Sequence, residues 1–191
     1  VSVNRTFRGP EFQILRSYQH NKLTRETEEY LRYILPLQDF QVVDQHFLPF
    51  NRDSSFLKLD LTASVANQFR KLGGTSAISP PRFALPSFEI PSQRIAPVRF
   101  NYPVYKTAEI TYTIDLEKDQ PITLPENTTH SSDYGIYSVV YSQKSSTITI
   151  KKSLLLYAGE YSLDQYPLLY SFLESIAKTE KQSILINPIS R

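Results

Sequence analysis

The sequence predicts an α+β fold that is mainly β: an antiparallel β-sandwich-like module with a C-terminal helix, preceded by a smaller strand-helix-helix-strand module. Residues 107–116 alternate strictly between apolar and polar side chains, which is typical of a strand with one buried and one exposed face. The chain has 13 tyrosines and 13 prolines but 5 glycines, and tyrosine favours pleated surfaces while proline marks edges and connections. Apolar residues recur at helical spacing near the C-terminus, from Tyr166 to Ile176.

The first predicted module covers residues 1–91. Its opening strand, residues 1–7, has a period of two and ends at Gly9-Pro10. A helix is expected over residues 11–20. A second helix is expected to begin after the N-cap Thr24 and to end at Pro36.

Two further strands are expected over residues 40–47 and 56–63, joined by the polar turn 51–54. Gly73-Gly74 reads as a β-turn rather than a phosphate-binding loop, because neither glycine motif of such loops is present. The proline-rich residues 80–97 mark the boundary, and the large apolar residues among them predict that this segment is packed.

The second predicted module covers residues 92–191. Its strands are residues 107–116, 134–141 and 147–157, followed by a helix that starts near Ser162. Pro167 falls in the first turn of that helix, where its missing N–H costs little. A closing strand is expected over residues 183–186.

Composition excludes several classes of function. The 21 basic and 19 acidic residues are interspersed, which argues against a nucleic-acid partner, and no apolar run is long enough for membrane insertion. The absence of cysteine removes thiolate nucleophiles, disulfides and thiolate metal ligands. The absence of methionine, with Val1 already inside a predicted strand, leads us to expect a piece of a longer protein.

No catalytic, cofactor-binding or metal-binding residue is predicted. The histidines His20, His46 and His130 lie in different elements without a metal-ligand spacing. Asp44 and His46 lie two apart on a predicted strand, so they form either a two-residue acid/base or metal pair or part of a solvated strand face. No serine lies in a nucleophile turn, and paired glycosidase-type carboxylates have no signature in sequence.

Tyr137 and Tyr141 are the candidate ligand contacts. They share one face of a predicted strand with Val139. If that face is exposed, the two rings form a small aromatic shelf of the kind that sugar-binding modules use. If the strand is buried on both faces by the C-terminal helix, they are core residues. This second interpretation is favoured, because the tyrosines of the chain fall mostly at core spacing.

The second half of the chain resembles a known family, the C-terminal domain of unknown function that follows the transglutaminase-like core in exported bacterial proteins. The residues that carry this resemblance are 108–116, 122–125, 134–141 and 160–167, with Phe172-Leu173, Ile176, Lys178 and Ile184. The first half is similar to the segment that links core to tail in those proteins, through residues 5–9, Leu15-Arg16 and residues 24–31.

The resemblance implies a non-catalytic tail, because the catalytic Cys, His and Asp of such proteins belong to the core and match no position here. It implies the upstream transglutaminase-like domain as partner and a location in the periplasm or at the cell surface. Another protein or a glycan is a further candidate partner. The sequence therefore predicts a structural or interaction module. The alternative is a carbohydrate-binding module, and a stand-alone hydrolase comes third.

Overall fold

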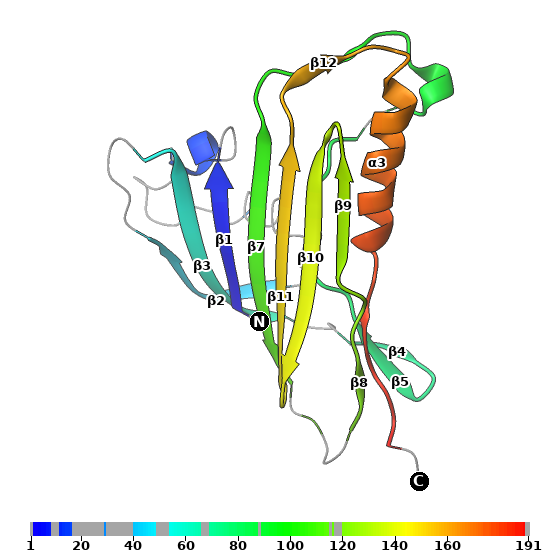
Figure 1. Ribbon diagram of the computed structural model, residues 1–191. Helices are drawn as coiled ribbons and strands as arrows, with labels where there is room; N and C mark the ends of the chain where they lie inside the picture. Colours follow the sequence, from blue (N-terminus) through cyan, green and yellow to red (C-terminus); the bar gives the residue numbers. More distant parts are fainter. Residues whose placement is uncertain are drawn as a thin grey trace.

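A computed structural model describes residues 2–8, 12–16, 29, 40–48, 54–65, 69–87, 89–114, 116 and 120–189. It confirms the predicted fold class, mainly β with few helices. Seven antiparallel strands form the main sheet in the order β2-β3-β1-β7-β11-β10-β9 (Figure 1). Their bounds are β1 Ser2–Arg8, β2 Phe40–Phe47, β3 Phe56–Val65, β7 Val104–Thr113, β9 Thr128–Ser132, β10 Gly135–Lys144 and β11 Thr147–Leu156.

This sheet takes strands from both sides of the predicted boundary at residue 91. Strand β1 pairs with β3 on one side and with β7 on the other, so that Arg5 lies opposite both Leu59 and Ala108. One continuous core cluster includes residues of both halves. The predicted modules 1–91 and 92–191 therefore share one sheet rather than each having its own.

Two small sheets complete the β structure. Strands β4 Phe69–Leu72, β5 Thr75–Ile78, β13 Ile184–Ile186 and β8 Ile122–Thr123 form one, in the order β4-β5-β13-β8. Strand β6 Val98–Phe100 pairs with β12 Gly159–Tyr161, and a 3-10 turn, η1, covers Pro91–Gln93. The predicted turn at Gly73-Gly74 joins β4 to β5, and Gly73 adopts φ 64°, a left-handed conformation that glycine tolerates.

Several predicted elements recur in the structure, some of them with shifted ends. The strand expected over residues 107–116 is β7, three residues earlier, and the strand over 40–47 is β2. Residues 12–16 are helical, within the helix expected over 11–20. Of the predicted second helix, only Glu29 is among the described residues, and it is helical. Gly9-Pro10 and the turn residues 51–53 lie outside the described residues.

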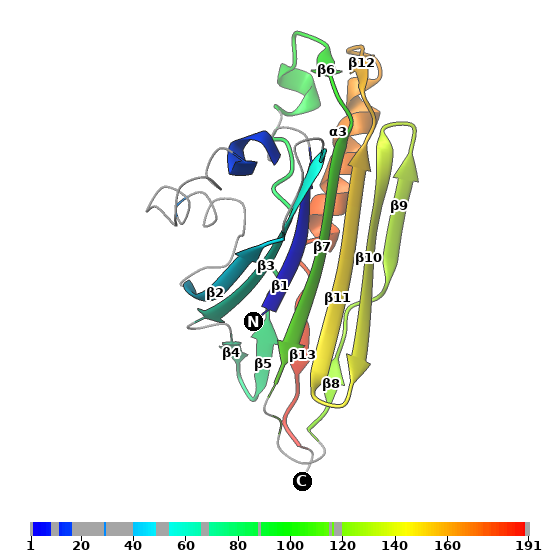
Figure 2. The same ribbon diagram turned by 90° about the vertical axis from the view of Figure 1, so that its left-hand side faces the viewer.

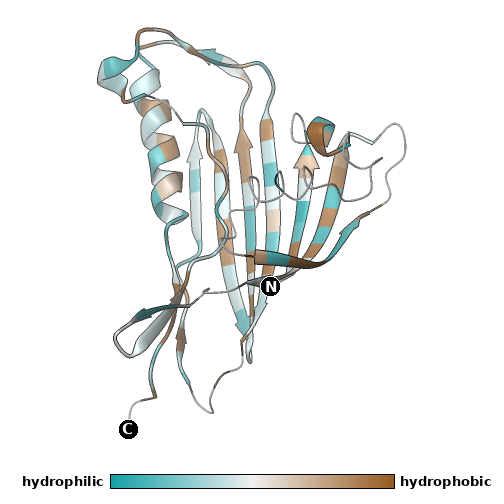
Figure 3. Cartoon of the chain, turned by 180° about the vertical axis from the view of Figure 1, so that it is seen from behind, coloured by the Kyte–Doolittle hydropathy of each residue, from teal (hydrophilic) through white to brown (hydrophobic). Residues whose placement is uncertain are grey.

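One face of the main sheet carries the core, and the other carries no described helix. Helix α3, Tyr166–Thr179, packs on the core face together with residues 12–16 (Figure 2). Its buried residues follow helical spacing and include Leu169, Phe172 and Ile176. Seen from behind, apolar and polar residues alternate along the strands (Figure 3). The sheet is therefore half covered, and its second face is available to solvent.

Candidate functional site

A buried ion pair lies between the main sheet and the end of α3. Lys152 of β11 places its Nζ 2.7 Å from Oε2 of Glu180, the residue that caps α3 at its C-terminus. Their side chains are 1% and 2% exposed. Charges removed from water to this degree are tolerated only where other polar groups surround them.

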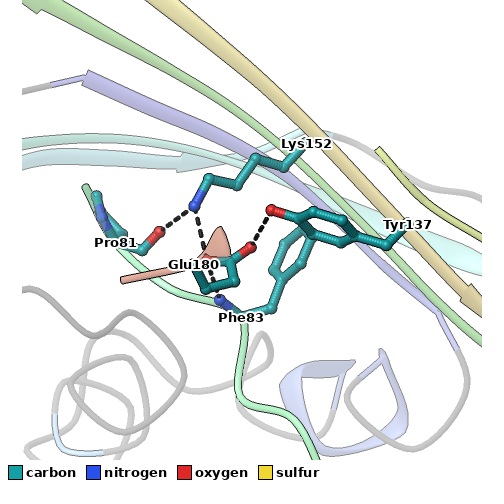
Figure 4. Close-up of polar contacts among 5 residues, drawn as sticks. All are labelled: Pro81, Phe83, Tyr137, Lys152 and Glu180. Carbon is teal, nitrogen blue, oxygen red and sulfur yellow. Dashed lines mark hydrogen bonds and ion pairs between the residues drawn. The ribbon is translucent and has the colours of Figure 1, made fainter. Parts of the chain in front are cut away.

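Both charged groups have further partners in the chain itself (Figure 4). Tyr137 donates its hydroxyl to Glu180 Oε1 at 2.8 Å, and the backbone N–H of Phe83 donates to Oε2 at 3.2 Å. Lys152 Nζ donates to the carbonyl oxygen of Pro81 at 2.9 Å. We call Lys152, Glu180 and Tyr137, with these two backbone groups, the buried clamp. It ties the sheet, the helix end and the proline-rich segment together.

Burial dominates the proton equilibria of the clamp. It raises the pKa of Tyr137 well above its usual range, and the neighbouring Glu180 carboxylate raises it further. Burial also lowers the pKa of Lys152, against the opposing effect of Glu180. Each side-chain polar atom of the clamp has a partner, and the clamp is closed to solvent.

The sequence does contain a sign of this clamp, a lysine at a core-facing position, which the strand prediction did not use. Lys152 falls in register with Ile148, Ile150 and Leu154 in the alternation of β11, so its position is core-facing although its side chain is charged. Lys106 of β7 is a similar case: it is 9% exposed and donates to the carbonyl oxygen of Ala84 at 3.0 Å.

Both predicted ligand contacts lie in the core. Tyr137 is 0% exposed and Tyr141 is 7% exposed, so the two rings do not form a shelf at the surface. Tyr137 stacks on His130, with ring centroids 6.0 Å apart, and His130 Nε2 lies 2.8 Å from the hydroxyl of Thr179. Burial and Glu180 raise the pKa of Tyr141 to about 12. The strand is nevertheless not buried on both faces, as expected from the sequence, because Ile136 and Val140 on its other face are 39% and 43% exposed.

On the exposed face of the sheet, the strand registers align polar side chains in rows across the strands. One row, which we call the polar row, runs from β2 to β11. Each member lies opposite the next: His46, Asp60, Asn4, Glu109 and Lys151. A second row beside it, the hydroxyl row, consists of Thr62, Ser2, Thr111 and Thr149. Directly opposite side chains in a sheet lie within contact distance.

An open hollow of about 480 Å³ lies over these two rows. Its polar lining comes from both rows and from Asp44: Ser2, Asn4, Asp44, His46, Asp60, Thr62, Glu109 and Thr111. Sequence reasoning missed this set, because β1, the neighbouring strands β2 and β3, and β7 are far apart in the chain and only their registers bring the side chains together. The parts of it visible in the sequence were the outward-facing alternation of β7 and the shared strand face of Asp44 and His46.

The carboxylates of the hollow already have partners. Asp44 and His46, the predicted pair, do face the same way, with Oδ2 3.1 Å from Nε2, but both are well exposed at 59% and 70%. Asn4 donates to Asp60, and Lys151 lies 3.5 Å from Glu109. No cluster of three or more His, Asp or Glu that suits a metal ion occurs among the residues that the structure describes.

A second, smaller hollow of about 160 Å³ lies between the proline-rich segment and α3. It is lined mainly by apolar groups, among them Leu85, Tyr170 and Leu173.

The other two histidines lie away from both hollows or outside the described residues. His130 makes the contacts with Tyr137 and Thr179 given above, and His20 lies outside the described residues. Among the described helices none is long and apolar enough to cross a membrane.

Part of the chain matches the model of a known protein family. The sequence profile of a family described as a domain of unknown function, DUF3858, matches residues 76–186. No curated protein and no solved structure matches the chain. The match begins within β5 and ends with β13, so it contains the proline-rich segment, the buried clamp and four strands of the main sheet.

Proposed function

Because the chain belongs to the DUF3858 family, we propose that it is a non-catalytic structural or interaction module from the C-terminal part of a larger transglutaminase-like protein. The observation that carries this proposal is the half-covered sheet. Its exposed face spans seven strands and carries no described helix (Figure 2). A face of this width suits contact with another surface better than it suits the enclosed chemistry of an active site.

A second feature of the exposed face supports an interaction role. The guanidinium of Arg8 lies 5.1 Å from the ring of Phe56 and 5.5 Å from the ring of Tyr105. Tyr105 is 38% exposed, and the two rings restrict the arginine side chain. Arginine and tyrosine are enriched among the residues that dominate protein interfaces.

The non-catalytic role is part of this proposal, and two features of the described residues support it. The buried clamp is closed to substrates, and the carboxylates of the exposed hollow are held by Asn4, His46 and Lys151. The transglutaminase-like parent, the upstream domain as partner, and the periplasm or cell surface as location rest on the family resemblance of the sequence.

Two measurements test this function. The gene region upstream of Val1 is expected to encode a transglutaminase-like core with its Cys, His and Asp. The chain itself is expected to give no turnover above a buffer blank in amine-incorporation, peptide and glycoside hydrolysis assays. Turnover that a single substitution abolishes would overturn the non-catalytic role, and an unrelated upstream region would overturn the parentage.

The alternative function, a carbohydrate-binding module, gains nothing from Tyr137 and Tyr141, since both rings are buried.

A further inference from the structure

We propose that a row of side chains on the exposed sheet face, centred on Arg8, docks a protein segment that carries a carboxylate beside large apolar side chains. The proposal rests on the interaction role given above and names the chemistry of the partner. The row crosses the adjacent strands β3, β1, β7, β11 and β10 and consists of Phe56, Arg8, Tyr105, Leu155 and Ile136. We call these five residues the arginine row.

The strand registers make the arginine row continuous. Arg8 lies directly opposite Phe56, Tyr105 opposite Leu155, and Leu155 opposite Ile136, while the ring of Tyr105 contacts Arg8 across β1 and β7. Tyr105 and Ile136 are 38% and 39% exposed. With strands about 4.8 Å apart, the row extends over roughly 19 Å. It is therefore a strip of accessible apolar surface with one cationic group in it, long enough for a short extended peptide.

Arg8 is already positioned for a partner. Its guanidinium lies 5.1 Å from the ring centroid of Phe56 and 5.5 Å from that of Tyr105, so the rings restrict the side chain and less conformational freedom remains to be lost on binding. Arg8 is exposed, and among the described residues its guanidinium has no hydrogen bond or ion pair. Its N–H groups match the two oxygens of a carboxylate in geometry.

The charges around Arg8 favour an anionic group. Lys58 of β3 is exposed on the same face, one row further along the strands, and its ammonium has no ion pair among the described residues. On β3, β1 and β7 the carboxylates of this face are Asp60 and Glu109, which lie two rows from the arginine row. Two rows correspond to roughly 13 Å along the strands. The surface next to Arg8 is therefore positively charged and complements a carboxylate.

The apolar members of the row favour a protein segment over a polyanion. An RNA or an anionic membrane requires many clustered cations, and this part of the face offers Arg8 and Lys58. A protein segment presents a single carboxylate next to apolar side chains. Tyr105, Leu155 and Ile136 follow Arg8 in one direction and suit such side chains. Tyrosine and arginine are also enriched where binding energy is concentrated in protein interfaces.

The test is a titration of the isotope-labelled chain with acetyl-Glu-Leu-Phe-amide and acetyl-Leu-Phe-Glu-amide, each to about 10 mM, followed by amide chemical shifts. We expect saturable shifts around the arginine row with at least one peptide. The same peptides with Gln in place of Glu are expected to bind about tenfold more weakly, because they lack the charge. Arg8→Gln is expected to weaken binding of the acidic peptide about tenfold. Arg99→Gln, the matched control at an exposed arginine of β6, leaves binding unchanged.

The proposal is wrong if neither acidic peptide gives saturable shifts, if the Gln peptides bind equally well, or if a folded Arg8→Gln variant binds as tightly as the unsubstituted chain. Inorganic phosphate or phosphatidylglycerol vesicles that bind at the row as tightly as the peptides would make it a general anion site and would also overturn it. None of these results affects the turnover assays or the upstream gene region, so the proposed function stands or fails by its own measurements.

Discussion

Glu180 holds the ammonium of Lys152 in the protein interior at 2.7 Å, with both side chains almost fully buried. The adjacent Lys151 points to the opposite face of the sheet, where it lies 3.5 Å from Glu109 and is 64% exposed. Two neighbouring lysines thus occupy opposite environments, because successive side chains of a strand alternate between its faces. The two ion pairs are expected to differ greatly in their contribution to stability.

Glu180→Ala leaves Lys152 buried without a counter-charge, and we expect it to lower the free energy of unfolding by about 3–5 kcal/mol. Lys151→Ala, its matched control on the exposed face, is expected to cost less than about 1 kcal/mol. Urea unfolding followed by circular dichroism measures both. Adding Lys152→Met to the Glu180 variant removes the stranded charge and is expected to recover part of the loss. Equal effects of the two single variants would contradict the account.

Tyr137→Phe removes the hydroxyl that donates to Glu180, and we expect a loss of about 1.5–3 kcal/mol because the acceptor is charged. Tyr112→Phe provides the comparison. The hydroxyl of Tyr112 is buried without a hydrogen-bond partner among the described residues, so its removal is expected to be neutral or stabilising. The measurement is again the unfolding midpoint in urea. A neutral Tyr137→Phe variant would show that the hydrogen bond contributes nothing.

Stability is expected to fall at alkaline pH partly through Tyr141. Its pKa is raised to about 12 by burial and Glu180, whereas an unfolded tyrosine titrates near 10. The folded state holds this proton more tightly, so the contribution is fully present below about pH 10 and is lost as the pH rises through about 12. Unfolding free energies at about pH 9 and 11 should therefore decline less in Tyr141→Phe than in the parent chain. An identical decline would contradict the assignment.

The strands with one apolar face were predictable, and the elements without such a pattern were not. The alternation in residues 107–116 identified β7, although its ends shifted by three residues because pairing with β11 from Thr147 to Leu156 sets the actual limits. Strand β9 consists of Thr-Thr-His-Ser-Ser, an edge strand with no apolar residue to reveal it. Strands β5 and β13 are short and pair across about a hundred residues.

The buried clamp and the hollow were beyond local patterns for a related reason. The partners of Lys152 come from Pro81 and Glu180, and the polar row combines β2, β3, β1 and β7. Such sets exist only once strand order and register are known. For Tyr137 and Tyr141, the local pattern was enough to predict that they share one strand face. Whether that face is buried depends on the elements that cover it, which the local pattern does not give.

Helix α3 is expected to be integral to the fold rather than an appendage. Leu169 is fully buried, and Leu169→Ala should cost about 2–5 kcal/mol through lost contacts and the cavity left behind. Its neighbour Leu168 is 65% exposed, and Leu168→Ala should change stability by less than about 0.5 kcal/mol. Truncation after Gly159 removes α3, Glu180 and β13 together and should give an unfolded or aggregated product. A soluble truncation that melts cooperatively would show the helix to be dispensable.

Hydroxyl-radical footprinting tests most directly whether the chain acts through the exposed face of its sheet. Tyr105, Ile136 and Val140 stand on that face, 38%, 39% and 43% exposed, and Leu168 on α3 serves as the reference. In the isolated chain all four side chains should be oxidised. In the longer parent protein, oxidation of the sheet residues should fall while that of Leu168 stays unchanged. Unchanged oxidation of the three sheet residues, with protection of Leu168, would contradict the account.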